Sequence, residues 1–196
     1  MNNRYMFSEL LSTAWALACT KAFYRPARLV RRPVYLRGRG HLSLGEGLTT
    51  GHGCRFDLAG DGITLRMGRR CELGDYTHIV AHQAVELGDD VLAASKVFIS
   101  DTDHGCCRGE KQDGPDTAPN ARALSYAPVK IGSRVWIGEN AVILAGSEIG
   151  DGCIVGANSV VRGRFEGGCM LAGAPAKVIK RWNEATNQWE REKQRT

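Results

Sequence analysis

The sequence predicts an all-β fold in which the chain winds into a coil of short strands, and three observations lead to this prediction. Aliphatic residues recur at every sixth position through much of the chain. Glycine accounts for 24 of the 196 residues, well above the usual share of roughly 7%, which indicates many tight turns. A chain of this length forms one domain more readily than two, so a single architecture should explain nearly all of it.

The N-terminal arm, residues 1–40, precedes the repeat and differs from it in charge. It holds eight Lys or Arg and one acid, whereas the rest of the chain carries a net charge of −2. Such an arm would suit an anionic membrane surface or an acidic ligand, although a merely solvated arm explains it equally well. Apolar residues follow helical spacing at Phe7, Leu11, Ala14, Trp15, Ala18 and Ala22. We therefore expect an amphipathic helix that lies on a membrane or packs on its own domain.

The cysteines and the apolar run of residues 10–19 bear on the cellular compartment. Seven cysteines at irregular spacing form no CxxC pair, which favours reduced thiols in a cytoplasmic protein. The apolar run is far shorter than the ~20 residues that span a bilayer. We expect a cytoplasmic protein, either free or peripheral at the inner membrane face, with no nucleic-acid partner.

The repeat region, residues 41–175, carries the six-residue recurrence. The unbroken part consists of Ile131, Ile137, Ile143, Ile149, Val155 and Val161. An earlier part consists of Met67, Leu73 and Ile79 and, after a two-residue slip, Leu87, Ala93 and Ile99. An α-helix would turn by about 600° over six residues and scatter these side chains around its circumference. A coil of three short strands would instead point one of them inward per strand, so they should form the core.

Residues 101–128 interrupt the recurrence and begin within the stretch VFISDTDHGCCR, residues 97–108. Three prolines, several glycines and no periodicity predict an irregular loop that leaves the coil, and such long loops are usually functional or disordered. In a strand-like continuation Asp101 and Asp103 share one side, and His104 faces the other. Histidine accepts protons near neutral pH, and a carboxylate can orient it. Spacing alone explains His104 equally well as a turn cap, and nothing marks Cys106 or Cys107 as a nucleophile.

Two segments, IGSRVWIGENAVILAGSEIGDGCIVGANSVV and AGAPAKVIK, resemble those of hexapeptide-repeat acyltransferases. The resemblance covers residues 65–181, and the repeat, WIG, GANSVV and AGAPAK occur in the expected order. It implies a left-handed parallel β-helix shaped as a triangular prism. It also implies acetyl transfer from acetyl-CoA without a metal, in a homotrimer whose active sites lie between protomers.

The resemblance also implies roles for individual residues. His104 matches the catalytic histidine, which takes the acceptor's proton, with Asp101 and Asp103 as candidate orienters. Backbone N–H groups near Gly138 are plausible donors to the oxyanion. The phosphates of coenzyme A need fixed donors and positive charge. The residues expected to bind the cofactor are Trp136, Gly138, Glu139, Ala157, Arg162, Lys177 and Lys180, and those expected near the acceptor are Asp75, Tyr76 and His82.

Departures from the galactoside-type pattern concern the acceptor and the fine geometry. Glu139 replaces a serine after WIG, and the usual Lys-Asp-Ile/Val-Pro turn is replaced by GRFEG at residues 163–167. Gly74 and His82 stand where an asparagine and an acid contact the sugar in those relatives. The likeness is strongest to bacterial polysaccharide O-acetyltransferases of lipopolysaccharide O-antigen or capsule synthesis. It implies a saccharide acceptor, free or lipid-linked.

The C-terminal segment, residues 176–196, has apolar residues at helical spacing. They are Val178, Trp182, Ala185 and Trp189. We expect a short helix that covers the open end of the prism or reaches a neighbouring subunit, because an uncovered end would expose an unpaired edge.

Three other functions stay open at this stage. One is an N-acetyltransferase acting on a nucleotide-linked amino sugar, because residue types do not separate hydroxyl from amine acceptors. Another is a metal-dependent lyase of the γ-class carbonic anhydrase type, which needs three converging histidines. His78, His82 and His104 are present, but Gly109 breaks that pattern. The third is a non-catalytic assembly module.

Overall fold

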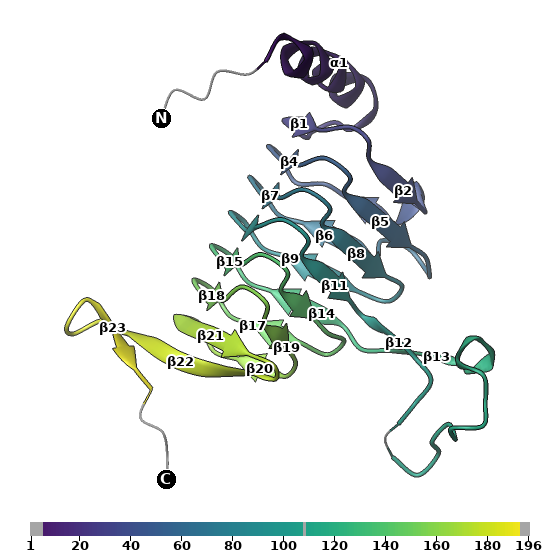
Figure 1. The fold of residues 1–196 in the computed structure, drawn as a ribbon, viewed down its shortest axis with the longest axis vertical. Helices are drawn as coiled ribbons and strands as arrows, with labels where there is room; N and C mark the ends of the chain where they lie inside the picture. The colour runs from purple at the N-terminus through teal and green to yellow at the C-terminus, as the bar shows by residue number, and fades with distance from the viewer. Residues whose placement is uncertain (1–5, 108, 193–196) are drawn as a thin grey trace.

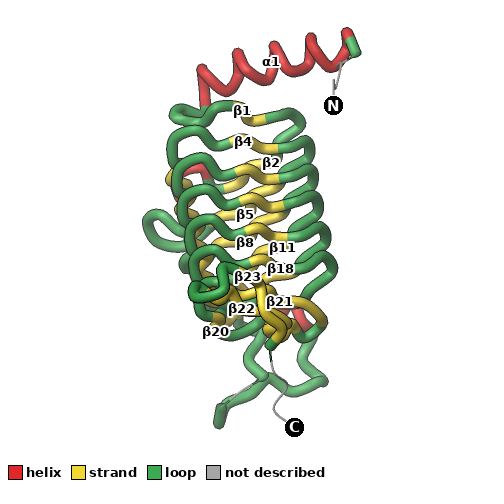
Figure 2. Tube along the Cα trace, turned by 90° about the vertical axis from the view of Figure 1, so that its left-hand side faces the viewer, coloured by secondary structure: helices red, strands yellow, loops and turns green. Residues whose placement is uncertain are grey.

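The chain folds into a three-sided parallel β-helix with one α-helix lying across its N-terminal end (Figure 1). The structure is a computed structural model that describes residues 6–107 and 109–192. Each strand of the prism pairs in parallel with the strand one coil away, as Phe98 does with His78 and Val142. Figure 2 shows the coils stacked along the prism axis. The predicted left-handed parallel β-helix is confirmed.

Three sheets form the sides of the prism, and we call them faces A, B and C. Face A consists of β1 (Leu29–Val30), β4 (Thr49–Thr50), β7 (Glu72–Leu73), β10 (Leu92–Ala93), β15 (Trp136–Ile137), β18 (Ile154–Val155) and β21 (Cys169–Gly173), continued by β22 (Ala176–Asn183) and β23 (Gln188–Arg191). Face B consists of β2 (Tyr35–Arg37), β5 (Arg55–Leu58), β8 (His78–Ala81), β11 (Phe98–Ser100), β16 (Val142–Ile143) and β19 (Val160–Val161). Face C consists of β3 (Leu42–Ser43), β6 (Leu65–Met67), β9 (Val85–Leu87), β14 (Val129–Ile131), β17 (Glu148–Ile149) and β20 (Arg164–Phe165).

The six-residue recurrence builds the core, as predicted. Ile131, Ile137 and Ile143 lie on faces C, A and B in turn, and they are 3%, 0% and 0% exposed. The other residues of the recurrence are buried in the same way. Burying each such side chain contributes about 1.5–3 kcal/mol, so stacked coils stabilise one another through one continuous column.

Both departures from the recurrence lie at the same edge of the prism, between faces B and C. The two-residue slip falls in the turn between β8 and β9, and the long excursion leaves one coil later, directly after β11. In the following coil the passage from β16 to β17 is short again. The chain therefore collects its irregular segments at one edge.

The outer surfaces of the three faces differ in chemistry. Face C carries charges that alternate in register between neighbouring strands: Arg66, Glu86, Lys130, Glu148 and Arg164. Such opposite-charge pairs suit a solvated surface. Faces A and B instead present apolar side chains, since Leu92 and Trp136 on face A are 46% and 51% exposed and Phe98 on face B is half-buried.

The C-terminal segment is a β-hairpin, and the predicted helix is wrong. Strand β22 pairs antiparallel with β21 and with β23, so the hairpin extends face A past the last coil. Trp182 lies directly opposite Trp189, and their ring centroids are 5.5 Å apart. The seven-residue spacing that suggests two helical turns is produced by a turn at 184–187, in which Asn187 takes a positive φ of 53°. Residues 193–196 of this segment lie outside the described chain.

The predicted N-terminal helix is confirmed as α1 (Phe7–Phe23). Its buried residues are Ala16, Cys19 and Thr20. The Thr20 hydroxyl donates to the Ala16 carbonyl at 2.7 Å and accepts the Val30 N–H at 2.8 Å, which holds the helix on the first coil. That coil begins at Leu29, inside the arm expected over 1–40, while residues 1–5 of the arm lie outside the described chain. Among the described helices, none is long and apolar enough to cross a membrane.

Candidate active site

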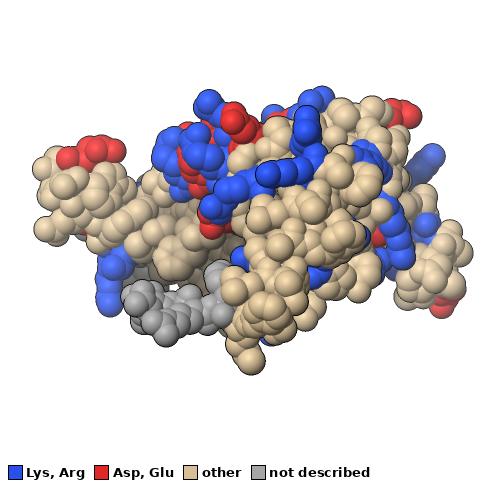
Figure 3. All heavy atoms as spheres, turned by 90° about the horizontal axis from the view of Figure 1, so that it is seen from above, with Lys and Arg blue, Asp and Glu red and all other residues tan. Residues whose placement is uncertain are grey.

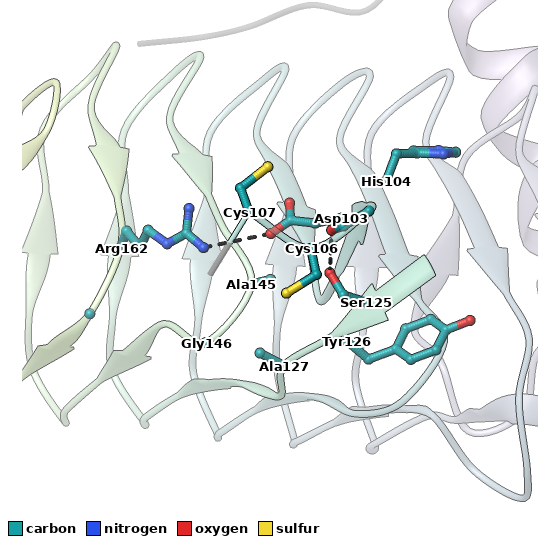
Figure 4. A pocket seen from close by; sticks show the side chains of 12 residues that line it. Asp103, His104, Cys106, Cys107, Ser125, Tyr126, Ala127, Ala145, Gly146 and Arg162 are labelled. Atoms are coloured by element: carbon teal, nitrogen blue, oxygen red, sulfur yellow. Dashed lines mark hydrogen bonds and ion pairs between the residues drawn. The ribbon is translucent and has the colours of Figure 1, made fainter. Parts of the chain in front are cut away.

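The excursion after β11 forms a hairpin and a cavity at the edge between faces B and C. Strand β12 (Thr102–His104) pairs antiparallel with β13 (Leu124–Tyr126), and the loop beyond them projects away from the prism (Figure 1). A cavity of about 550 Å³ lies between the hairpin and the next coils (Figure 4). Asp103, His104 and Tyr126 line it from the hairpin, and Gly146 and Arg162 line it from the coils.

Arg162 connects the hairpin to the last coil. Its guanidinium lies 3.6 Å from the Asp103 carboxylate, and both side chains are partly exposed. An exposed pair of this kind contributes at most about 1 kcal/mol to stability. The effect of this ion pair is local, because it holds the Asp103 side of β12 toward Arg162 at the cavity.

His104 is exposed and points away from Asp103 and Arg162 (Figure 4). Its backbone is held by the pairing with Leu124 across the hairpin. Because side chains alternate along a strand, Asp103 and His104 face opposite sides. The ring is thus accessible to a substrate from outside, while its backbone position is fixed.

The two aspartates have partners other than the His104 ring. The Asp101 side chain is fully buried, and its carboxylate accepts N–H groups of His82 (3.0 Å), Gln83 (2.7 Å) and Ala84 (2.8 Å) and the Thr102 hydroxyl (2.7 Å). It therefore caps the lengthened turn of the preceding coil. Asp103 faces Arg162, so the structure does not bring either predicted orienter to His104 within this chain.

The residues expected near the acceptor fall into two places. His82 lies at the B–C edge, and its ring meets the Tyr126 ring edge-on at 6.2 Å between centroids. Asp75 and Tyr76 lie instead at the edge between faces A and B. There the Asp75 carboxylate accepts the His52 N–H at 2.7 Å, and Tyr76 is exposed with a positive φ of 58°.

Three of the predicted cofactor residues lie in two neighbouring coils at the A–B edge: Gly138 and Glu139 in one, and Ala157 in the next. A Cβ added to Gly138 would come within 2.5 Å of the Ala157 nitrogen, so only glycine fits there. Glu139 lies 3.9 Å from the Lys96 ammonium. The Gly138 N–H donates to the Val155 carbonyl at 2.8 Å, so the oxyanion donor would be another backbone N–H group near Gly138.

The other predicted cofactor residues, apart from Arg162, belong to the extended sheet of face A. Trp136 projects from β15, and Lys177 and Lys180 lie on β22. Arg181 on the same strand is held by Glu166 at 3.2 Å and Glu192 at 2.9 Å, whereas Lys177 is exposed. Lysines at the end of the sheet that also carries Trp136 suit a long ligand that carries phosphates.

The predicted site residues thus form two groups on different edges of one prism. Asp103, His104, His82 and Arg162 gather at the B–C edge, and Gly138, Glu139 and Ala157 lie at the A–B edge with Trp136 and the lysines on the adjoining face A. Face B separates the two groups. A donor bound at the A–B edge of one chain would therefore be remote from that chain's own histidine.

The buried thiols and the histidines provide no second centre in the described part of the chain. Burial raises the pKa of the Cys54 thiol to about 11 and raises the pKa of Cys71, Cys153 and Cys169 as well. High pKa values make thiols poor nucleophiles. Among the described residues no group of three His, Cys, Asp or Glu is placed to hold a metal ion.

Some residues of the cavity have no obvious signal in the sequence. Tyr126 and Ser125 reach it on β13, where the Ser125 hydroxyl donates to the Gly105 carbonyl at 2.8 Å. Asp113 accepts the Cys106 N–H at 2.7 Å and so shapes the loop behind the cavity. Only the short alternation LSY ahead of Pro128 could have indicated a strand there.

A prism of hexapeptide coils with an exposed histidine on an excursion loop defines a class of acyl-transferring enzymes, and comparison with known proteins agrees. The family model described as "Bacterial transferase hexapeptide (six repeats)" matches residues 128–163. A protein of Escherichia coli strain K12 named "Putative lipopolysaccharide biosynthesis O-acetyl transferase WbbJ" is 43% identical over 189 residues, which cover 96% of each chain. The chain belongs to the hexapeptide-repeat acyltransferases and is an acyltransferase.

Two solved structures show the same architecture. A mutant of AntD, an N-acyltransferase from Bacillus cereus in complex with dTDP-4-amino-4,6-dideoxyglucose and coenzyme A, superimposes with a TM-score of 0.69. At 19% identity over 95% of this chain and 94% of that one, it shows the fold alone. A hexapeptide-repeat acetyltransferase of Vibrio cholerae O1 biovar eltor, complexed with acetyl coenzyme A, has 25% identity and a TM-score of 0.52 over 68% of this chain and 70% of that one.

Proposed function

We propose that this enzyme transfers an acetyl group from acetyl-CoA to a sugar hydroxyl in the synthesis of a bacterial surface polysaccharide, either O-antigen or capsule. The observation that carries the proposal is the 43% identity to WbbJ over nearly the whole of both chains. The exposed His104 at the cavity agrees with it. The proposal places the reaction in the cytoplasm, at the membrane face that carries a lipid-linked acceptor.

His104 is the proposed general base. Acetyl-CoA supplies the acetyl group as a thioester. The imidazole takes the proton of the acceptor hydroxyl as the hydroxyl oxygen bonds to the acetyl carbonyl carbon. The thioester C–S bond then breaks, and the imidazolium gives the proton to the departing sulfur. The products are the acetyl ester and coenzyme A as a free thiol. General-base catalysis of this kind contributes about 10²–10⁴-fold to the rate.

A homotrimer with sites between protomers is the second part of the proposal. Within one chain, face B separates His104 from Gly138 and Ala157, so one prism does not assemble the site. The loop beyond β12 and β13 projects away from its own prism (Figure 1). The apolar side chains on faces A and B also favour burial against another copy, whereas the charged face C suits solvent. A neighbour's A–B edge set against the B–C edge would bring donor and base together.

Thiol release is the measurement that tests the acceptor class. Purified enzyme is given acetyl-CoA with a panel of sugar nucleotides, amino-sugar nucleotides and lipid-linked oligosaccharides. We expect turnover with a hydroxyl acceptor and a product whose acetyl group is lost in mild base, as esters are. A base-stable acetamide formed only with amino sugars would assign the enzyme to N-acetylation. No release with any acceptor would contradict the proposal.

The Lys177→Ala variant should raise the KM for acetyl-CoA about 10- to 100-fold, with little change in kcat. A charge-assisted hydrogen bond contributes about 1.5–3 kcal/mol, and a contact present in both ground and transition states affects KM alone. Lys130→Ala on face C removes the same charge away from the site and should leave KM unchanged. Equal KM values for wild type and Lys177→Ala would remove Lys177 from the cofactor site.

A further inference from the structure

The side of α1 that faces away from the prism is apolar. At 100° per residue, one side of the helix carries the following apolar residues: Phe7, Leu10, Leu11, Ala14, Trp15, Leu17, Ala18 and Ala22. Lys21, in the last turn, is the one charged residue on this side. Its large side chains are exposed, with Phe7 at 76%, Trp15 at 65% and Leu11 at 58%. The apolar stripe expected from the sequence is therefore not the side that packs on the domain.

The opposite side of α1 already serves as the packing surface. Ala16, Cys19 and Thr20 are buried there, and Thr20 is bonded to β1. Arg31 of the first coil donates to the Thr13 hydroxyl at 3.2 Å. With one side fixed to the prism, the apolar side faces outward along its whole length, about 25 Å at 1.5 Å per residue.

The segment that holds α1 and the start of the prism is basic, and the Arg25, Arg31 and Arg39 side chains contact the helix itself. Between residues 6 and 40 the chain has one acid, Glu9, and the following bases: Lys21, Arg25, Arg28, Arg31, Arg32, Arg37 and Arg39. Two of them have acidic partners, since Arg28 lies 3.2 Å from Glu72 and Arg37 lies 3.4 Å from Asp57. Figure 3 views the molecule from this end and shows Lys and Arg atoms beside a broad uncharged surface.

We propose that α1 is a docking surface for an anionic lipid bilayer. Aromatic and aliphatic side chains on one side, bordered by arginines, match the boundary between acyl chains and acidic headgroups. A second copy of this chain is a poorer occupant, because it would bring two strongly basic ends face to face. The single acid in the segment, Glu9, accepts the backbone N–H of Met6 at 2.9 Å and offers little compensation.

The docking geometry also indicates which sugar of the acceptor His104 can reach. This inference rests on the proposed function, which supplies the lipid-linked acceptor. Because α1 lies across the prism end (Figure 2), a helix in the membrane plane directs the prism away from the bilayer. Face B runs from β2 to β11 in three strand steps, about 14 Å at 4.7–4.9 Å per step. His104 would therefore act on the outer sugars of a lipid-linked oligosaccharide rather than on the sugar next to the lipid.

Vesicle co-sedimentation of the full chain tests the docking surface. Vesicles contain phosphatidylcholine alone or with about one third phosphatidylglycerol, an anionic lipid. We expect binding to the anionic vesicles that is at least tenfold tighter than to neutral ones and that weakens as salt rises. Trp15→Glu should reduce binding at least tenfold. Ser12→Glu adds the same charge to an exposed position of α1 outside the apolar side and should bind within about twofold of the wild type.

Two results would overturn the proposal. One is a wild-type chain that binds no vesicles. If such a chain instead forms larger assemblies and Trp15→Glu dissociates them, the apolar side of α1 contacts another copy of the chain. The other is Trp15→Glu binding as well as the wild type. Circular dichroism confirms that each variant is folded. Thiol release with a soluble acceptor is measured in parallel. A Trp15→Glu variant that loses vesicle binding but keeps its turnover supports docking. A wild type that binds vesicles but shows no turnover contradicts the proposed function and leaves the docking surface intact.

Discussion

Replacing His104 with alanine is expected to lower kcat for acetyl transfer by about 10²–10⁴-fold, the usual contribution of a general base. The ring is exposed at the cavity, and its removal leaves the β12–β13 backbone pairing intact. The KM for acetyl-CoA should change little, because all the proposed cofactor residues except Arg162 lie at the A–B edge or on face A. Steady-state thiol release with a saturating acceptor measures both constants.

A second histidine variant, away from the cavity, shows whether the fall in kcat is specific to His104 or follows from the loss of any histidine. His41 lies near the N-terminal end of the prism, where its ring bonds to the Gly62 carbonyl at 2.7 Å. His41→Ala should retain wild-type kcat. Equal rates for wild type and His104→Ala would refute the assignment of the base. A fall in kcat accompanied by loss of the folded far-UV signal would show a structural effect instead, and His104→Gln then tests the base with the size of the side chain largely kept.

The recurrence of aliphatic residues was sufficient to predict the prism, because a core position in this fold is decided locally. Each inward residue packs on the residue one coil away, so a period of six in sequence becomes a column in space. Ile137 and Val155 illustrate this, being paired strand to strand and both almost fully buried. No long-range information is needed beyond the repeat itself.

The C-terminal hairpin could not be predicted in the same way. Trp182 and Trp189 are compatible with helical spacing and with a hairpin, and the choice depends on whether an open sheet edge is available. Face A supplies that edge at β21, which pairs with β22. Strand pairing with the prism thus overrides a local pattern that favours a helix.

The candidate site was predictable as a set of residues but not as an arrangement. His104 follows directly from the end of the recurrence at Ile99. Which edge each residue occupies depends on how many residues precede it within its coil, and the partners of Asp101 lie one coil earlier. The spacing of 17–19 residues between Asp101 and the turn at 82–84 was a usable signal, since one coil comprises three six-residue repeats, each a short strand and a turn.

The Asp101→Ala variant should be less stable than the wild type by about 3–5 kcal/mol. The carboxylate is fully buried and accepts three backbone N–H groups at 2.7–3.0 Å. Hydrogen bonds to a charged group contribute about 1.5–3 kcal/mol each, and their removal leaves buried donors unpaired. Urea denaturation followed by circular dichroism measures the change in the free energy of unfolding.

Asp103→Ala is the matched control, because its carboxylate is only partly buried and forms one ion pair with Arg162. Its effect on the free energy of unfolding should stay below about 1 kcal/mol.

The Asp101 carbonyl also accepts the Ala127 N–H at 2.9 Å and closes the neck of the excursion. This backbone bond persists in Asp101→Ala, so the hairpin should stay attached while the turn at 82–84 loosens beside it. Equal unfolding free energies for Asp101→Ala and Asp103→Ala would show that the buried carboxylate does not hold this edge together.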